Sequence, residues 1–280
     1  MFPEAAENYF EKMINTNTEM MKQTVEAKLR GKGTPRPMLK EIRAVVPQTA
    51  VMGIADVVIA TRLEDDIDKI HGKRDGIMSG GGRKTQVLDV AMGMSLCIEK
   101  GMDRRSAAVA AQMDIEAYYD KLPVVLVAEL LLEKGADPAV VEAAVRHQML
   151  CQININVKNT NRRMKTRSSG GLTGSRVGGQ LARVPVEQMM RDNFEMLKRA
   201  SFDCGEGRFV GPGSWVDNLY LLGASATTVA HTMTNIEQYL QTRWHLRINT
   251  AVEKSSPAKA TPRSKTDSRP WSMTASSGQL

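Results

Sequence analysis

The sequence predicts an α+β protein in which helices pack on one face of an antiparallel sheet. Three observations lead to this class. The first third of the chain is rich in good helix formers, and over about residues 48–72 the apolar residues recur at three- and four-residue intervals. From about residue 107, short segments with the two-residue period of a strand appear, and helical stretches separate them. Strands that alternate with helices in this way build a layered sheet-and-helix domain.

The N-terminal third is expected to be mostly helical. Residues 4–30 contain Glu, Ala, Met and Lys without an internal breaker, and "RGKGTPRP" then ends the pattern with two glycines and two prolines. A second helix is predicted over about residues 48–72, with acids on the face opposite the apolar one. After a loop, "HGKRDGIMSGGGRK", residues 84–100 are expected to form a third helix.

The remaining elements follow in a regular order. "SAAVAAQMD" is expected to be a buried strand that ends in Asp114. Gly135 closes the apolar helix of "LPVVLVAELLLEKG", and Asp137 with Pro138 opens the next one. "QININVK" alternates as a strand does, with "RRMKTR" as its hairpin partner. We then expect a helix in "VPVEQMMRDNFEMLKRA", two short strands in "GRFVGPGSWVDNLYLLG", a helix opened by Ser or Thr in "SATTVAHTMTNIEQYLQTRW", and a final strand, "HLRIN".

Composition favours an intracellular protein, in the nucleus or the cytoplasm. The 280 residues are 42% hydrophobic and 25% charged, and no apolar run approaches the roughly 20 residues of a membrane span. The N-terminus is acidic where a secretory signal would carry a basic segment and then an apolar one, which favours an intracellular protein. No membrane partner is expected. Three distant cysteines argue against a disulfide framework, and no histidine has zinc-ligand spacing with them. The segment from about residue 252 is polar and bears prolines, which predicts disorder.

The basic charge of the chain permits a polyanionic partner. The net charge is +7, and "KNTNRRMKTRSSGG" concentrates cations with no acid among them. These cations are Lys158, Arg162, Arg163, Lys165 and Arg167. The segment is either a solvated basic hairpin or a surface that follows a phosphate backbone.

Two aspartates occupy unusual positions. Asp114 ends an apolar strand, and Asp217 interrupts the apolar run of "GSWVDNLYLLG". Carboxylates are costly to bury unless they are paired or bind a metal. Two carboxylates from adjacent strands would suit Mg²⁺, with substrate phosphates as further ligands, in a two-metal phosphoryl transfer. The alternative is that Asp217 and Asn218 merely form a hairpin turn, a role that both residue types favour.

Several segments resemble reverse transcriptases of the LINE (non-LTR retrotransposon) type. "DIEAYYDKLP" resembles the first metal-binding motif of that family, and "SWVDNLYLLG" resembles its aromatic-x-Asp-Asp hairpin. Between them, "TGSRVGGQLARVP" resembles the glycine segment of the family, with matches at Gly174, Arg176, Gly178 and Leu181. "WHLRINTAVEKSS" resembles the last palm motif, "IRAVV" the finger segment, and "DGIMSGGGRKT" the glycine-rich loop before the palm. The resemblance covers roughly residues 40–256, in the order of the family.

The resemblance implies a right-hand polymerase with fingers and palm. The implied divisions are an N-terminal helix and linker over residues 1–37, a fingers-like region over 38–106, a palm over 107–251 and a disordered polar tail over 252–280. The implied function is that of an RNA-directed DNA polymerase domain, a fragment of a retroelement that uses two-metal nucleotidyl transfer. Its partners would be an RNA template, a DNA primer and deoxynucleoside triphosphates.

The resemblance also assigns roles to single residues. Asp114 and Asp217 would be catalytic and would hold Mg²⁺ or Mn²⁺, with the backbone carbonyl of Ile115 nearby. The residues implied to contact the nucleotide are Tyr119 under its sugar, Gly178 beside it, and Arg43 and Lys254 at its phosphates. The implied nucleic-acid contacts are Arg162, Arg163, Lys165, Arg167 and Arg176. Plain structural roles stay open: core packing for Tyr119, a turn before a helix for Gly178, and a solvated tail for Lys254.

The sequence departs from the family pattern in two motifs. Asn218 stands where the family has the second hairpin aspartate, which removes one negative charge beside the metals. In the glycine segment, Val177 replaces glutamine and Ala182–Arg183 replaces Ser-Pro. A catalytically degenerate, nucleic-acid-binding remnant of the same fold is therefore an alternative function. A helical scaffold without a nucleic-acid role is a third, based on the helical N-terminal third.

Overall fold

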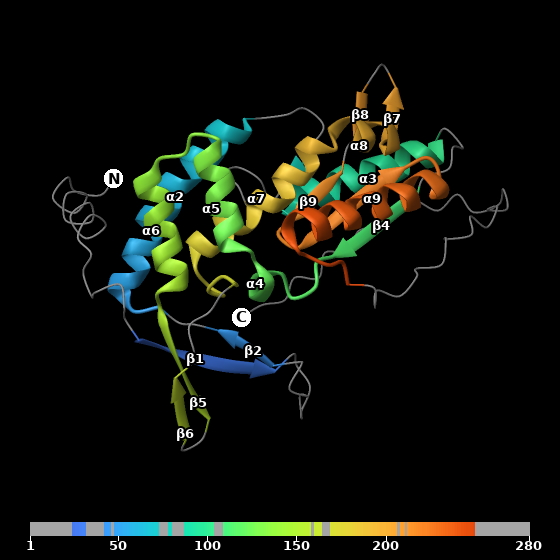
Figure 1. Cartoon of the computed structure of the whole chain (residues 1–280). Coiled ribbons are helices and arrows are strands. Elements are labelled where there is room, and N and C mark those ends of the chain that lie inside the picture. Colours follow the sequence, from blue (N-terminus) through green and yellow to red (C-terminus); the bar gives the residue numbers. More distant parts are fainter. Residues whose placement is uncertain are drawn as a thin grey trace, which may run out of the picture.

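The computed structural model describes residues 24–31, 42–45, 48–72, 78–79, 87–103, 109–157, 160–163, 169–205, 208–210 and 212–249. Helices and short strands mix along these ranges, as the sequence predicted (Figure 1). The expected helix before residue 24 and the polar tail after residue 252 lie outside the described residues. None of the helices within these ranges is long and apolar enough to span a membrane.

Most helices begin and end where the sequence predicted. The helices of the described residues are α2 (Ala50–His71), α3 (Val87–Asp103), α4 (Tyr118–Lys121), α5 (Val124–Glu133), α6 (Pro138–Met149), α7 (Arg176–Asp192), α8 (Phe194–Ala200) and α9 (Ala226–Trp244), and of these the short α4 was not predicted. The Asp137 carboxylate accepts a hydrogen bond from the Ala139 amide at 2.9 Å and so caps α6. Ser225 caps α9 in the same way, through the Thr228 amide. Local capping chemistry therefore sets these boundaries.

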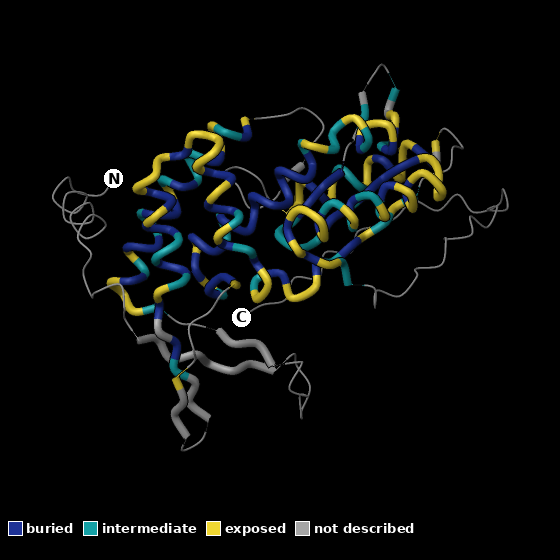
Figure 2. Tube along the Cα trace, in the orientation of Figure 1, coloured by how far each residue is buried: buried dark blue, intermediate teal, exposed yellow. Residues whose placement is uncertain are grey.

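Helix α7 begins earlier than the sequence suggested. The prediction began this helix near residue 184, but Ser175 caps it and Arg176 is its first residue. The glycine segment thus forms the first turns of a helix. Residues 181–190 are all buried, because α7 is enclosed by α2, α5, α6 and α9 (Figure 2). Tertiary packing on every side offsets the low helix propensity of its two glycines.

The first sheet, which we call the central sheet, contains the hairpin that bears Asp217. Its strand order is β3 (Met78–Ser79), β9 (Gly213–Trp215), β10 (Asn218–Gly223) and β4 (Val109–Asp114). β10 is antiparallel to both β4 and β9, and β3 is parallel to β9. This arrangement confirms a small antiparallel sheet.

A second sheet, the distal sheet, corrects two expectations. It has the order β2 (Ile42–Val45), β1 (Thr24–Gly31), β5 (Gln152–Val157) and β6 (Thr160–Arg163). Residues 24–31 are a strand and not the end of a helix, since "TVEAKLRG" alternates apolar and polar residues and its ladder joins β5 and β2. The strand pair β5–β6 belongs here and not beside β4, so the strands do not form one sheet. In Figure 1 the distal sheet lies apart from the central sheet.

Two further strand predictions change in detail. β7 (Phe202–Gly205) and β8 (Arg208–Val210) form a separate hairpin. The segment "HLRIN" contributes only an isolated bridge, between Ile248 and Ile115. That bridge nevertheless fixes the chain after α9 beside the end of β4.

Helices cover parts of both faces of the central sheet, which corrects the prediction of a single covered face. Residues paired across antiparallel strands share a face, so Met113 and Leu219 point one way, and they join the core to which α9 contributes. On the opposite face, Leu222 packs with Cys97 of α3 and with Phe202. The end of this second face that bears Asp114 stays only partly buried.

Candidate active site

The two aspartates lie at the same end of one strand pair. Asp114 is the last residue of β4, and Asn218, the first residue of β10, is its partner across the ladder. Asp217 immediately precedes Asn218, and its backbone oxygen accepts a hydrogen bond from the Ile115 amide at 3.0 Å. The backbone pairing therefore fixes Asp114, Ile115 and Asp217 next to one another.

A tight turn presents Asp217 at the tip of the β9–β10 hairpin. Trp215 pairs with Asn218, which leaves only Val216 and Asp217 in the turn. Val216 has a φ of 57°, in the left-handed region that β-branched residues rarely adopt. A positive φ at the first turn residue matches the twist of antiparallel strands in a two-residue hairpin. The hairpin thus holds a strained residue directly before the aspartate.

Side-chain amides contact both carboxylates. The Asn249 side chain donates to Asp114 Oδ2 at 3.3 Å, and its backbone amide donates to the Asp114 backbone oxygen at 2.7 Å. The Asn218 side chain donates to Asp217 Oδ1 at 3.2 Å, and Gln112 donates to Asn218 Oδ1 at 2.9 Å. Asn218 therefore has a defined hydrogen-bonding role in addition to its place in the strand.

Tyr119 lies beside this hairpin. It belongs to the short helix α4 and is half-buried. Burial raises the pKa of its phenol, and the negative charge of Asp217 raises that pKa further. The phenol is therefore neutral at physiological pH and close enough to Asp217 to sense its charge.

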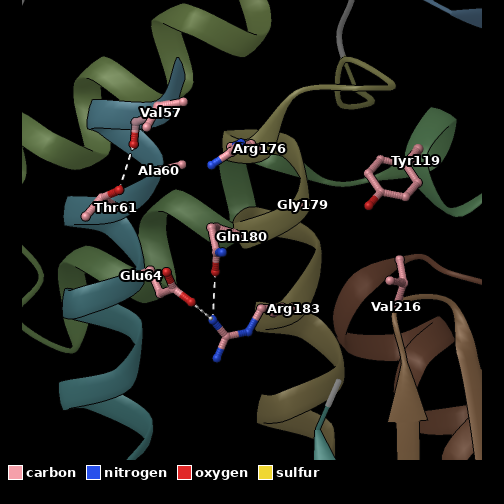
Figure 3. Close-up of a pocket in the computed structure, with 10 residues that line it drawn as sticks. All are labelled: Val57, Ala60, Thr61, Glu64, Tyr119, Arg176, Gly179, Gln180, Arg183 and Val216. Atoms are coloured by element: carbon pink, nitrogen blue, oxygen red, sulfur yellow. Dashed lines mark hydrogen bonds and ion pairs between the residues drawn. The ribbon is translucent and has the colours of Figure 1, made fainter. Parts of the chain in front are cut away.

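A pocket of about 260 Å³, which we call the α2–α7 pocket, opens between these two helices and the hairpin. Figure 3 shows Tyr119 and Val216 on one side and residues of α2 and α7 on the other. The lining residues are Val57, Ala60, Thr61, Glu64, Tyr119, Arg176, Gly179, Gln180, Arg183 and Val216. Three predicted site features, the first motif, the hairpin and the glycine segment, thus meet at one pocket.

The two glycines of α7 have different surroundings. A Cβ on Gly178 would come within 3.1 Å of the Leu172 backbone oxygen and 3.2 Å of Gln148 Oε1, in the interior. Gly179 lines the pocket, and the Tyr119 hydroxyl lies 4.0 Å from the position of its absent Cβ. The sequence pointed to Gly178 as the residue beside a nucleotide, whereas the adjacent Gly179 faces the pocket.

A buried carboxylate fixes the start of α7. Asp56 of α2 is 2% exposed, and it accepts hydrogen bonds from the Ser175 hydroxyl at 2.5 Å and from the Arg176 amide at 2.6 Å. His147 Nε2 lies 2.9 Å from Asp56 Oδ1. Burial alone would raise the pKa of Asp56, but the hydrogen bonds from His147, Ser175 and Arg176 outweigh it and lower that pKa. Asp56 was missed because only the fold brings it to the N-terminus of α7.

A second charged network closes the pocket. Arg183, 8% exposed, donates to Glu187 at 3.0 Å, to Asp68 at 3.0 Å and to Gln180 at 2.7 Å. Glu64 lies 3.6 Å from the same guanidinium. Arg183 had been noted only as a departure from the family pattern. Its position four residues before Glu187 on a helix was the signal that could have indicated an ion pair.

The remaining predicted residues are more scattered. Arg176 is exposed and lines the α2–α7 pocket. Arg163 is exposed on β6, and Arg43 and Arg162 lie in β2 and β6 of the distal sheet. Lys165, Arg167 and Lys254 lie outside the described residues. Of the predicted cations, the structure therefore brings Arg176 to the pocket.

The carboxylate pair has the right donor chemistry for a hard divalent cation. Within the described ranges, no group of three or more His, Cys, Asp or Glu side chains could by itself hold a metal ion. Asp114 and Asp217 offer only oxygen donors, and Mg²⁺ commonly binds one or two carboxylates and takes its other ligands from water and substrate phosphates. The residues present therefore fit Mg²⁺ that arrives with a phosphate-bearing substrate.

Comparison with known proteins bears on the fold. No protein-family model and no curated protein sequence matches the chain. Among solved structures, telomerase from Candida albicans in complex with a TWJ fragment of telomeric RNA aligns with 88% of this chain and 46% of its own, at 11% identity and a TM-score of 0.55. Apo telomerase from Candida tropicalis, truncated from its C-terminal domain, aligns with 87% of this chain and 53% of its own, at 10% identity and a TM-score of 0.55. Another apo structure of the Candida tropicalis telomerase aligns with 88% of this chain and 47% of its own, at 10% identity and a TM-score of 0.57.

These similarities define the class of fold. Telomerase is related to reverse transcriptases, so the chain has a reverse-transcriptase-like polymerase fold. At identities of 10–11% the likeness extends to the fold alone and does not support the LINE-type family in particular. The chain spans about half the length of the telomerase chains that it matches, 46% and 53% in the two cases above.

Proposed function

We propose that the chain is an RNA-directed DNA polymerase domain, of the LINE retrotransposon type, that joins deoxynucleotides to a DNA primer on an RNA template. One observation carries the proposal: the β4–β10 ladder brings Asp114 and Asp217 together beside the pocket that Tyr119 and α7 line. A chain of this fold, with one carboxylate at the end of β4 and another at the tip of the adjacent hairpin, has the donor set that phosphoryl transfer requires.

Each residue has a distinct role in the proposed reaction. Asp114 and Asp217 hold Mg²⁺, which supplies charge neutralisation for the attacking 3′-hydroxyl and the leaving pyrophosphate. The neutral Tyr119 ring supports the sugar of the nucleotide and leaves no room for a 2′-hydroxyl. Gly179 lets the backbone of α7 approach the nucleotide closely. Arg176, exposed at the pocket edge, attracts phosphate oxygens.

Nucleic-acid partners follow from the same geometry and from charge. The chain carries a net charge of +7, and its structural neighbour from Candida albicans is a complex with telomeric RNA. The basic hairpin that contains Arg162 and Arg163 would follow the phosphate backbone. We infer an origin in a retroelement from the order of the motifs along the chain.

Primer extension tests the proposal. The full chain, supplied with Mg²⁺, an RNA template, a DNA primer and deoxynucleoside triphosphates, should extend the primer. Asp114→Ala and Asp217→Ala should each lower the rate by at least about a hundredfold, because each removes a metal ligand worth several kcal/mol of barrier. Asp103→Ala, at the exposed end of α3, serves as the matched control and should leave the rate unchanged. Equal extension by the wild type and both site variants would overturn the assignment.

A specific observation favours a second candidate, a nucleic-acid-binding domain that has lost catalysis. The Asn218 amide donates to Asp217, so one carboxylate oxygen already has a partner and one charge of the family hairpin is absent. This candidate predicts salt-sensitive binding of a primer-template duplex without incorporation, in either Mg²⁺ or Mn²⁺. Metal-dependent extension would exclude it.

A further inference from the structure

The side chain of Asn218 lies between two polar groups of opposite character. Its Oδ1 accepts from Gln112 Nε2 at 2.9 Å, and its Nδ2 donates to Asp217 Oδ1 at 3.2 Å. Both ends of the amide therefore have a partner, and the side that faces Asp217 presents a donor. This orientation suits a carboxylate without a cation, since a donor faces a negative oxygen.

Gln112 holds Asn218 from the neighbouring strand. It precedes Asp114 by two residues on β4, so both side chains are on the same face of the central sheet, which is also the face of Asn218. Gln112 is exposed, and its carboxamide can rotate without disturbing the core. A carboxamide has an oxygen acceptor at one end and two donors at the other, so a half-turn exchanges them with little change in shape.

We propose that Gln112 and Asn218 form a coupled amide switch, in which both carboxamides turn over together and direct Asn218 Oδ1 toward a divalent cation held by Asp114 and Asp217. Asn218 then acts as a neutral oxygen ligand where a second hairpin carboxylate is missing. The inference rests on the proposed function, because it needs a cation at these two aspartates.

The hydrogen bond between the two amides is kept in both orientations. In the observed one, Gln112 donates and Asn218 accepts. After both amides turn over, Asn218 donates and Gln112 accepts, so only the group that faces Asp217 changes. Without a cation the turned state sets an oxygen against a carboxylate, and with a cation the observed state sets an N–H donor against positive charge. The cation therefore selects the turned state, and amide oxygens are ordinary ligands of hard divalent cations.

Substitutions of Gln112 lock the switch in either orientation. Glutamate can only accept a hydrogen bond, so Gln112→Glu requires Asn218 to donate to it and leaves Oδ1 toward the cation. Lysine can only donate, so Gln112→Lys keeps Oδ1 away from the cation. Relative to the wild type, we expect Gln112→Glu to bind the cation more tightly and Gln112→Lys more weakly, each by about threefold to tenfold, the value of one hydrogen bond.

A second background separates the switch from simple charge. In Asn218→Asp the side chain has no donor, so it cannot turn over. A charge effect alone gives the same ratio of affinities between Gln112→Glu and Gln112→Lys in both backgrounds. The switch instead gives a larger ratio with Asn218 than in the Asn218→Asp background, and the difference is the coupling energy of the double-mutant cycle.

Mn²⁺ titration of the full chain, with free Mn²⁺ read by electron paramagnetic resonance and no nucleic acid present, measures these affinities. Weaker binding by Asp114→Ala and Asp217→Ala, with a ratio that shrinks in the Asn218→Asp background, supports the switch. Unchanged Mn²⁺ affinity in Asp114→Ala and Asp217→Ala overturns the proposed metal site and the switch with it. Normal dependence on the two aspartates with equal ratios in both backgrounds overturns the switch alone. Circular dichroism of each variant verifies that it is folded.

Discussion

Val216 shows how a single residue bears the strain of the hairpin. Its φ of 57° costs about 1–2 kcal/mol for a residue with a Cβ, and glycine avoids this cost. We therefore expect Val216→Gly to be more stable than Val216→Ala by about 1 kcal/mol. Both variants remove the isopropyl group, so their difference isolates the backbone.

Urea unfolding of the two variants measures this difference. Alanine is normally the more stable residue, so the expected order is a reversal of the usual one. Gly53 in α2 is the comparison site, because nothing lies within 4 Å of the position of its absent Cβ. At this site Gly53→Ala should show the ordinary increase in stability on replacing glycine by alanine in a helix. A Val216→Ala variant as stable as Val216→Gly would contradict strain at the turn.

Gly223 is confined at the end of β10. A Cβ there would collide with the Ala200 backbone oxygen and lie 2.7 Å from Val229 Cγ2. Gly223→Ala should therefore destabilise the protein by about 1–3 kcal/mol, the usual cost of overpacking. Gly53→Ala, with open space around its Cβ, is again the matched control and should stabilise α2 by about 0.5–1 kcal/mol. Thermal unfolding that shifts both variants in the same direction would refute this account.

At the scale of elements, local signals predicted most helices and missed what depends on partners. Asp137 and Ser225 define helix starts by capping chemistry that is readable in the sequence. The strand at residues 24–31 was missed because the segment combines good helix formers with the two-residue alternation of a strand. The pairing with β5, which the sequence does not reveal, makes it a strand and not a helix. The start of α7 was missed because Asp56, 120 residues from Arg176, stabilises it.

The joint between α2 and α7 predicts a dependence of stability on pH. Burial raises the pKa of Asp56, but hydrogen bonds from His147 and Ser175 outweigh it, so that pKa lies below its ordinary value of 3.8 in the folded protein. The contribution of Asp56 is therefore fully present above the unfolded pKa and is lost as the pH falls through the folded one. Asp56→Asn should cost about 3 kcal/mol at neutral pH, since it removes the buried negative charge that accepts hydrogen bonds from Ser175 and Arg176, and less near pH 3.

Chemical denaturation at several pH values measures this loss. Glu133→Gln removes an exposed carboxylate at the end of α5 and serves as the control, with little change at any pH. A cost for Asp56→Asn that stays constant down to pH 3 would show that Asp56 does not stabilise the joint through its charge.

At the scale of the whole molecule, the sequence predicted which segments bring the two aspartates together better than it predicted how the strands divide into sheets. Asp114 and Asp217 were expected on adjacent strands; β4 and β10 do pair, with Asp114 at the end of β4 and Asp217 in the turn directly before β10. The α2–α7 pocket was not predicted, because α2 carries no family motif and reaches the hairpin only through the packing of α7. Short motifs specify local chemistry, whereas the side of the pocket that α2 forms depends on which helices pack together.

The last prediction concerns association with nucleic acid, a property of the whole charge distribution. Neutralising phosphates releases counterions, so the logarithm of the binding constant should fall linearly with the logarithm of salt concentration. Arg176 is the first residue of α7, and its side chain is exposed at the edge of the pocket. The hydrogen bond from Arg176 to Asp56 comes from the backbone amide, so a change of the side chain leaves it in place. Arg176→Ala should therefore keep the fold, weaken binding of an RNA–DNA duplex, and reduce the salt slope by about 1.

Arg199→Ala removes the same charge from the exposed surface of α8, away from the pocket, and is the matched control. Fluorescence anisotropy over roughly 50–200 mM salt gives both slopes. If Arg176 contacts a phosphate, Arg176→Ala releases one counterion fewer on binding, so the salt slope falls for this variant alone. Arg199→Ala should change the affinity only slightly, by lowering the net charge of +7 by one. Equal slopes for the two variants would mean that binding senses only total charge, and the α2–α7 pocket would then not lie along the path of the duplex.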